Sequence, residues 1–142
     1  MTTSSIRAKI DCPIERVWAV VTAVDDYSWR SDLSGTEILD ERRFVEYAKG
    51  GIATTFTVTA METCRRWEFD MENANMTGHW SGVFTAGDSA TEIEFTECVE
   101  AKRLLMRPFV KAYLKKQQAR FVADLRRRCE GGRAVKGFAP GG

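Results

Sequence analysis

The sequence predicts an α+β domain in which an antiparallel sheet is covered on one face by a long helix. Two observations predict this class. A strand and a helical segment open the chain, and six further strand-like segments follow with short turns between them. One long segment with helical periodicity comes after them. Strands joined by short turns pair antiparallel, and a long amphipathic helix buries its apolar side against such a sheet.

The first elements lie within the N-terminal 30 residues. A strand is predicted over Ser5–Asp11 because apolar residues alternate there. A helix follows, with Asp11 or Cys12 as its cap and Pro13 in its first turn, where a missing N–H costs nothing. This helix is expected to end near Asp25. The segment Tyr27–Arg30 favours a second short helix or a tight link.

Six strand-like segments occupy the middle of the chain. Their connections are short and rich in Gly, Asn, Asp and other turn residues, as hairpins require. Together with the first strand they predict an antiparallel meander. The six segments are Thr36–Asp40, Arg43–Ala48, Ala53–Met61, Arg66–Asn73, Gly78–Ala86 and Ala90–Val99.

A helical period runs from Ala101 to about Cys129, and Pro108 near its start indicates a kink or a new helix start. The domain is therefore expected to span residues 1–130. Residues 131–142 are glycine-rich and without periodicity, which predicts a disordered tail. The predicted apolar side of the helix consists of Met106, Val110, Tyr113, Leu114, Gln117, Phe121 and Leu125.

Charge, length and cysteine usage limit the classes of protein to consider. A chain of 142 residues with a formal charge of +1 fits one domain and gives no general argument for nucleic acid as a partner. No apolar run is long enough for a signal peptide or a membrane span. Four scattered cysteines and one histidine predict reduced thiols and no metal or cofactor. We expect a cytoplasmic monomer or weak dimer.

A resemblance to a known family begins in the stretch IDCPIERVWAVVTAVDDYSWRSDL, through Pro13, Val17-Trp18, Asp25-Asp26 and Trp29. This stretch resembles the opening of the START-like (SRPBCC) superfamily, in its polyketide cyclase/dehydrase branch. The later stretch GHWSGVFTAGDSATEIEFT resembles the family's penultimate hairpin. The resemblance covers about residues 4–129 and implies a helix-grip fold. In that fold, a curved seven-stranded antiparallel sheet wraps a long C-terminal helix above an apolar cavity. The family has no shared catalytic residues, so the resemblance implies a fold and a ligand class but no reaction.

Strand alternation assigns side chains to the predicted cavity. The alternative is plain core packing, which aromatic rows beneath a helix also produce. Gly78 and Gly82 lie on the tryptophan side of their strand and leave room for sheet curvature or for a bound molecule. The predicted ligand-binding residues are Trp29, Phe56, Val58, Trp67, Phe69, Trp80, Phe84, Phe95, Glu97, Val110, Tyr113, Leu114, Gln117 and Phe121.

Glu97 is the acid in an otherwise apolar row, with Phe95 and Val99 as neighbours. A buried carboxylate without a partner costs several kcal/mol, so it must find donors or take up a proton. Three other arrangements remain open: exposure at the open end of the sheet, a bulge that turns the side chain outward, or a pair with a helix arginine. The candidate partners are Gln117, Tyr113, Arg103 and Arg107.

Two further features carry weaker hypotheses. His79 lies opposite Trp80 by alternation, outside the cavity, so it is not expected to act in catalysis. Between Lys102 and Arg128 there are ten basic residues and one acidic residue, Asp124. Such a face is usually only solvated, but it can also meet anionic lipid, nucleic acid or an acidic partner. Because the helix needs its apolar side for the core, we do not expect it to lie in a membrane.

These observations support three functions. The first is a protein that binds a small hydrophobic molecule, either lipid-like or polycyclic and aromatic. The second is an enzyme similar to the polyketide cyclases and dehydrases, with Glu97 as the acid/base candidate. The third is an interaction module that acts through the basic helix.

Overall fold

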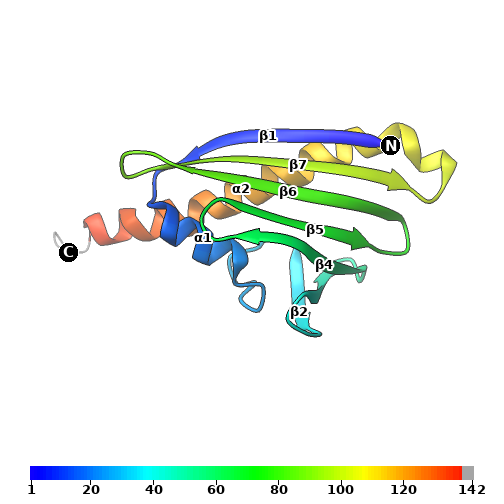
Figure 1. The fold of residues 1–142 in the computed structure, drawn as a ribbon, viewed down its shortest axis with the longest axis horizontal. Helices are drawn as coiled ribbons and strands as arrows, with labels where there is room; N and C mark the ends of the chain where they lie inside the picture. The colour runs from blue at the N-terminus through cyan, green and yellow to red at the C-terminus, as the bar shows by residue number, and fades with distance from the viewer. Residues whose placement is uncertain (139–142) are drawn as a thin grey trace.

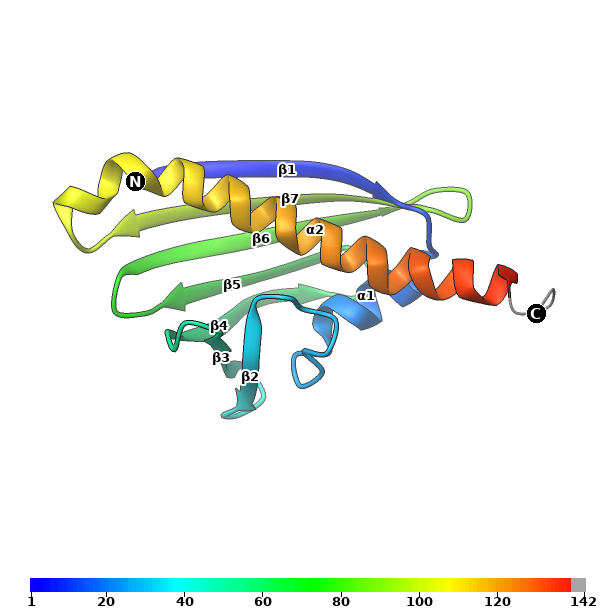
Figure 2. The ribbon, with the colours of Figure 1, turned by 180° about the vertical axis from the view of Figure 1, so that it is seen from behind.

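The fold is a single curved antiparallel sheet with a long helix across its inner face (Figures 1 and 2). The computed structural model describes residues 1–138, with side chains described through residue 131. The seven strands lie in the order β1-β7-β6-β5-β4-β3-β2, and every neighbouring pair is antiparallel. This order confirms the predicted helix-grip fold. The strands are β1 (Thr2–Ile10), β2 (Leu33–Ile38), β3 (Arg43–Ala48), β4 (Ala53–Glu62), β5 (Arg66–Glu72), β6 (Met76–Ala86) and β7 (Thr91–Ala101).

Three helical segments accompany the sheet. The short helix α1 (Ile14–Thr22) follows β1, and a 3-10 turn η1 (Leu104–Met106) leads into α2 (Arg107–Phe138). Figure 2 shows α2 crossing the sheet, where it packs mainly on β1. In residues 1–138, no helix is long and apolar enough to cross a membrane.

The predicted second short helix is wrong. Residues 27–30 form a turn, closed by a hydrogen bond from Arg30 N to Tyr27 O. The reason is local, because the Asp26 carboxylate accepts hydrogen bonds from both the backbone N–H and the hydroxyl of Ser28 (3.1 and 2.6 Å). Such an Asx turn competes with helix formation.

The C-terminal helix is longer than the periodicity predicted. It runs to Phe138, past the expected end near Cys129, and Pro108 lies in its first turn, directly after η1. The helical backbone therefore enters the segment for which a disordered tail was expected. Residues 139–142 of that segment lie outside the described residues, and its disorder stays a prediction.

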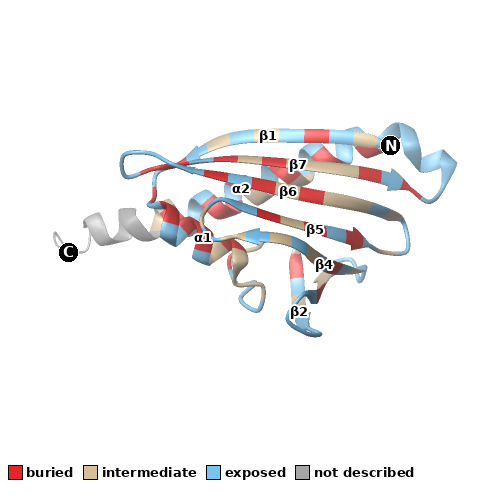
Figure 3. Cartoon of the chain, viewed as in Figure 1, coloured by how far each residue is buried: buried red, intermediate tan, exposed pale blue. Residues whose placement is uncertain are grey.

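The buried side of α2 differs from the predicted stripe. Gln117 is only half-buried, and the buried amide is Gln118, which is 4% exposed. Gln118 accepts a hydrogen bond from the Ser4 hydroxyl and donates one to the Ser4 carbonyl, both at 2.8 Å. The difference arises because α2 leans toward β1, which turns position 118 inward and leaves Met106 and Tyr113 exposed. The buried residues of α2 are Val110, Leu114, Gln118, Val122, Asp124, Leu125 and Cys129 (Figure 3).

Gly82 makes room for a neighbouring side chain rather than for a guest. A Cβ atom added there would lie 2.5 and 2.8 Å from the indole ring of Trp80. At Gly78, an added Cβ would lie 2.8 Å from the Cys98 carbonyl oxygen. The two glycines therefore allow close packing within the sheet, with Trp80 folded over Gly82.

Candidate functional site

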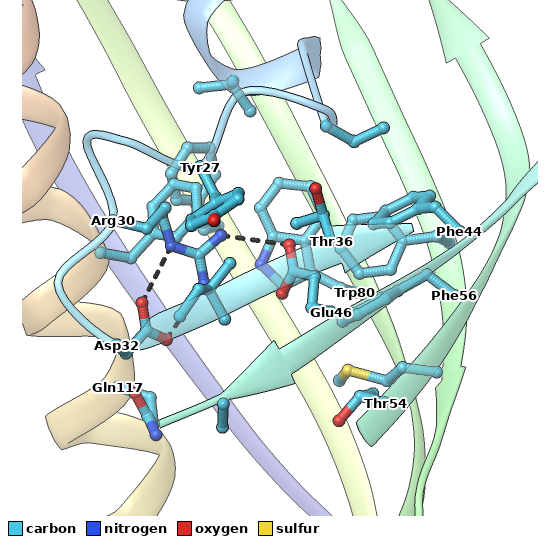
Figure 4. Close-up of a pocket in the computed structure, with 18 of the residues that line it drawn as sticks. Tyr27, Arg30, Asp32, Thr36, Phe44, Glu46, Thr54, Phe56, Trp80 and Gln117 are labelled. Atoms are coloured by element: carbon cyan, nitrogen blue, oxygen red, sulfur yellow. Dashed lines mark hydrogen bonds and ion pairs between the residues drawn. The ribbon is translucent and has the colours of Figure 1, made fainter. Parts of the chain in front are cut away.

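A cavity of about 160 Å³ lies between the sheet, α2 and the loop that joins α1 to β2 (Figure 4). Its walls are largely aromatic. Phe69 stacks on Trp80 and Phe44 stacks on Phe56, each pair with 4.8 Å between ring centres. The aromatic lining consists of Tyr27, Trp29, Phe44, Phe56, Trp67, Phe69, Trp80, Phe95, Tyr113 and Phe121.

One guanidinium group joins two carboxylates inside this aromatic cavity (Figure 4). Arg30 binds Asp32 through two parallel hydrogen bonds of 3.1 Å, and it binds Glu46 at 3.2 Å. The Arg30 side chain is 13% exposed, and its carbon Cζ lies 4.7 Å from the ring centre of Phe121. Burial lowers the pKa of Arg30, but the charges of Glu46 and Asp32 outweigh this effect and raise it.

Glu97 also lines the cavity, as do Asp26, Asp32 and Glu46, but its carboxyl group is not bonded to a basic side chain among the described residues. The pairing of β7 with β1 and β6 runs without a register shift, so alternation holds and Glu97 faces the same side as Phe95. Its carboxyl group makes no hydrogen bond or ion pair within the described part of the chain. Burial raises the pKa of Glu97 to about 7. The positive charge of Arg30 lowers this pKa, and the negative charge of Glu46 raises it. Glu97 therefore exchanges its proton near neutral pH.

The cavity has an excess of negative charge. Burial raises the pKa of Glu46 as well, while the charge of Arg30 opposes this effect. Arg30 is the single basic residue in the described lining and faces the carboxyl groups of Asp32, Glu46 and Glu97. Because a buried surplus charge is costly, a proton or a donor group of a guest stabilises this arrangement.

The partner predicted for Glu97 is wrong. Arg103 and Arg107 are exposed, outside the cavity lining. Gln117 donates a hydrogen bond to the hydroxyl group of Tyr113 (3.2 Å) rather than to the acid. The cation that acts on Glu97 is Arg30, in the α1–β2 loop.

The loop that carries Arg30 is attached to α2. The backbone N–H and the hydroxyl of Ser31 both donate to Asp124, at 2.8 and 2.9 Å. Asp124 is buried and also accepts a hydrogen bond from Arg127 (2.6 Å). A second link joins Arg128 to Asp26 (3.1 Å). The single acid of the basic stretch therefore holds the cavity loop in place.

Most predicted ligand-binding residues lie in the cavity wall. Ten of them line it: Trp29, Phe56, Trp67, Phe69, Trp80, Phe95, Glu97, Tyr113, Gln117 and Phe121. Of the other four, Phe84, Val110 and Leu114 are buried in the core and Val58 packs partly buried against it. Sequence reasoning missed Arg30, Asp32 and Glu46. The sequence feature that could have indicated Arg30 and Asp32 is the opposite charges two positions apart in WRSD, shortly after the predicted helix end.

Trp67 adds an unused donor to the wall. Its ring is buried, and its Nε1 has no hydrogen-bond partner among the described residues. A buried donor that stays unpaired costs about 1–3 kcal/mol. An acceptor oxygen on a guest would remove that cost if it reached this nitrogen.

The remaining chemical groups lie away from the cavity. His79 is on the outer face of the sheet, where Nδ1 lies 2.7 Å from Asp70 and Nε2 lies 2.8 Å from Glu68. All four cysteines are free thiols. Burial, and then the neighbouring Cys12, raise the pKa of Cys129 to about 12. Within the described residues, no group of His, Cys, Asp and Glu side chains is arranged to hold a metal ion.

Comparison with solved structures shows which proteins share this fold. A START superfamily protein from Mycobacterium smegmatis superposes with a TM-score of 0.84 at 14% identity, covering 91% of this chain and 97% of that one. The Zhui aromatase/cyclase from Streptomyces sp. R1128 superposes with a TM-score of 0.83 at 12% identity, covering 91% and 93%. XoxI from Bacillus cereus gives a TM-score of 0.80 at 10% identity, covering 91% and 96%.

Sequence comparison gives the family. No curated protein matches the sequence. The family described as "Polyketide cyclase / dehydrase and lipid transport" matches residues 1–130, which contain every strand and most of α2. The chain therefore belongs to this polyketide cyclase/dehydrase and lipid transport family.

Proposed function

We propose that this protein binds a small apolar molecule of one or two rings in the aromatic cavity. The observation that carries the proposal is an aromatic cavity lining that contains one unpaired carboxyl group, Glu97. Ligand sites are mostly apolar, with a few polar groups that fix the orientation of the guest. The family's description, which includes lipid transport, supports a hydrophobic ligand in general.

The size of the cavity limits the guest. Sites for drug-sized molecules have volumes of roughly 300–1,000 Å³, and the cavity here has about 160 Å³. An apolar cavity of about 150 Å³ in another protein accommodates benzene. A compact ring system fits within this space, whereas a long acyl chain would have to extend out of it.

The polar groups define how the guest is substituted. Glu97 accepts a hydrogen bond from an O–H or N–H group when ionised and donates one when protonated. Trp67 offers an N–H that needs an acceptor. A ring with a hydroxyl group supplies both a donor and an acceptor, so a phenol or naphthol is the preferred type of guest.

A matched pair of probes tests this proposal. Titration of the full chain with a naphthol and with naphthalene, followed by the quenching of tryptophan fluorescence, should show saturable binding of both. Binding of the naphthol should be tighter by about 0.5–1.5 kcal/mol because of the added hydrogen bond. Thr36→Phe, which fills the cavity, should weaken binding at least tenfold. The control is Thr57→Phe on the exposed side of β4.

The result that would overturn the proposal is equal binding by Thr36→Phe and by the unmodified chain. In that case the probe would be bound outside the cavity. The predicted cytoplasmic location and the monomeric or weakly dimeric state stay predictions.

A second candidate function is ring closure or dehydration of a flexible substrate. The pKa of Glu97, at about 7, is the observation that favours it, because a general acid/base works best with a pKa near the operating pH. The fold shared with an aromatase/cyclase agrees with this chemistry. In ring closure Glu97 would take a proton from a carbon next to one carbonyl group, the enolate would form a C–C bond to the second carbonyl carbon, and Glu97 would return the proton to the resulting alkoxide. In dehydration Glu97 would take a second proton from the same carbon and give it to the departing hydroxyl group, which leaves as water.

The enzyme and the binding protein respond differently to Glu97→Gln. Incubation with a small linear diketone, followed by NMR, would detect the cyclised and dehydrated enone. An enzyme loses this turnover by about 10²–10⁴-fold in Glu97→Gln while it still binds the naphthol probe. Turnover that survives the substitution would exclude Glu97 as the acid/base.

A further inference from the structure

The first turns of α2 and the segment before them form an exposed apolar surface. Leu104, Leu105 and Phe109 are 70%, 87% and 65% exposed, and Met106 and Tyr113 are exposed beside them. Every residue from 102 to 109 is exposed. Figures 1 and 2 both show this segment projecting beyond the end of β7, at the end of the molecule opposite the C-terminus. We call residues 102–113 the α2 tip.

Residues 102–109 of the α2 tip are not needed for the core. The buried residues of α2 begin at Val110, which is one helical turn after Met106. The expectation that the apolar side of this helix is consumed by core packing therefore holds only from Val110 onward. Contiguous exposed apolar residues on a soluble domain mark an interaction site more often than chance.

All charged residues in the α2 tip and in the next turns of the helix are basic. Residues 101–123 contain seven basic residues and no acidic residue. Lys102 pairs with Glu72 (3.0 Å), and Lys111 donates a hydrogen bond to the carbonyl of Thr3. Arg103 and Arg107 are exposed and have no acidic partner within the described residues. Their charge is free to meet an external anion.

We propose that the α2 tip docks on an anionic lipid surface. Segments that lie at a bilayer interface combine apolar side chains, which enter the boundary of the headgroups, with Lys and Arg, which meet anionic lipids. Leu104, Leu105 and Phe109 supply the first part, and Arg103 and Arg107 supply the second. An acidic protein surface would satisfy the arginines but would leave the leucines in water.

Docking at the tip would bring the cavity wall close to the membrane. Tyr113 belongs to the tip and also lines the cavity, and Gln117 lies one turn further along α2. Contact of the α2 tip with lipid involves the exposed surface of the tip, so it does not depend on whether the cavity binds a ring compound.

Co-sedimentation of the full chain with vesicles tests the docking. Equimolar phosphatidylcholine and phosphatidylglycerol vesicles should sediment the protein at low salt, and pure phosphatidylcholine vesicles should sediment far less. Arg103→Gln and Arg107→Gln should each weaken the partition about fivefold, because each basic residue near such a surface contributes about a factor of this size. Leu104→Ser/Leu105→Ser should weaken it more than tenfold.

Matched controls separate docking from a general loss of folding. Met61→Ser replaces an exposed apolar residue on β4, and Arg65→Gln replaces an exposed basic residue, both away from the tip. Neither should change the sedimented fraction. Each tip variant should keep the wild-type circular dichroism spectrum, since the replaced side chains are exposed.

Three outcomes would overturn the proposal. In the first, the wild-type chain stays in the supernatant with anionic vesicles. In the second, the arginine variants fail to sediment but the leucine variant sediments normally, which would indicate an acidic macromolecule as the partner. In the third, the leucine variant converts a dimer to a monomer in analytical ultracentrifugation without any vesicle binding. That result would make a second copy of the chain the occupant.

Discussion

Two clusters of charged side chains lie on opposite faces of the same sheet, and they differ in burial and in balance. The inner cluster consists of Arg30, Asp32, Glu46 and Glu97, inside the aromatic cavity. The outer cluster joins His79 to Asp70 and Glu68, where the side chains of His79 and Asp70 are 40% and 62% exposed.

The comparison shows that proximity of acids and bases does not by itself make a site. In the outer cluster water screens the charges, and each ring nitrogen of His79 already has a carboxylate partner. In the inner cluster Glu97 is partly buried and has no bonded partner among the described residues. A carboxyl group in a cavity that lacks a hydrogen-bond partner can be satisfied by a guest or by a proton.

The largest difference between the two faces should come from removal of one arginine from each, namely Arg30 in the inner cluster and Arg66, which pairs with Glu68 on the outer face. Arg30→Met leaves the carboxyl groups of Asp32 and Glu46 buried without a counterion, and it should lower the free energy of unfolding by about 3–5 kcal/mol. Arg66→Met on the outer face, which removes pairs with Glu62 and Glu68, should cost less than about 1 kcal/mol. Urea denaturation measures both. Equal losses would contradict the distinction drawn between the two clusters.

A smaller effect is expected from the pH dependence of stability in Glu97→Gln. In the unfolded chain Glu97 loses its proton near its ordinary pKa of 4.5, and in the folded chain near 7. Between these values the folded state binds more protons, so wild-type stability falls as the pH rises through this window. Glutamine does not titrate. The variant should therefore gain stability relative to wild type, by on the order of 2–3 kcal/mol, between about pH 4.5 and pH 8.

Glu94→Gln is the control for this experiment. Glu94 lies on the same strand but faces outward and pairs with Arg7 on the surface. Its stability relative to wild type should change by less than about 1 kcal/mol over the same pH range. A flat difference curve for Glu97→Gln would show that this carboxyl group is hydrated in the folded protein.

The smallest effect concerns His79. Burial is the largest single effect on its pKa and lowers it, but the hydrogen bonds and charges of Asp70 and Glu68 together outweigh burial and raise the pKa above its ordinary value of 6.5. The pair stabilises the fold fully below about pH 6.5, and the contribution is lost as the pH rises through the folded pKa. An NMR titration should place the pKa above 6.5, and Asp70→Asn should lower it. His79→Gln should cost less than about 1 kcal/mol at pH 6.

The sequence was most informative where side chains follow a strand. Alternation placed Trp80 and Glu97 on the inner face, because β6 and β7 pair with their neighbours without a register shift, which preserves the two-residue period. On α2 the same kind of reasoning selected Gln117 rather than Gln118. A 3.6-residue period leaves adjacent positions ambiguous until the packing direction of the helix is known.

The part of the site that could not be predicted lies outside regular structure. Arg30 and Asp32 belong to a loop, where no periodicity assigns a side chain to a face. Glu46 is on β3, between two buried or half-buried neighbours, and its direction depends on how the sheet curves. The ion pairs of Arg30 with Asp32 and Glu46 depend on the tertiary fold, which brings a loop and a distant strand together.

The attachment of the α1–β2 loop to Asp124 has a consequence for binding affinity. A loop that orders only when a guest arrives loses conformational entropy at that moment, and this loss subtracts from affinity. Here the two hydrogen bonds from Ser31 and the pair between Asp26 and Arg128 fix the loop beforehand. The guanidinium of Arg30 is thus preorganised. The conformational entropy of its loop is lost when the chain folds and not when the guest binds.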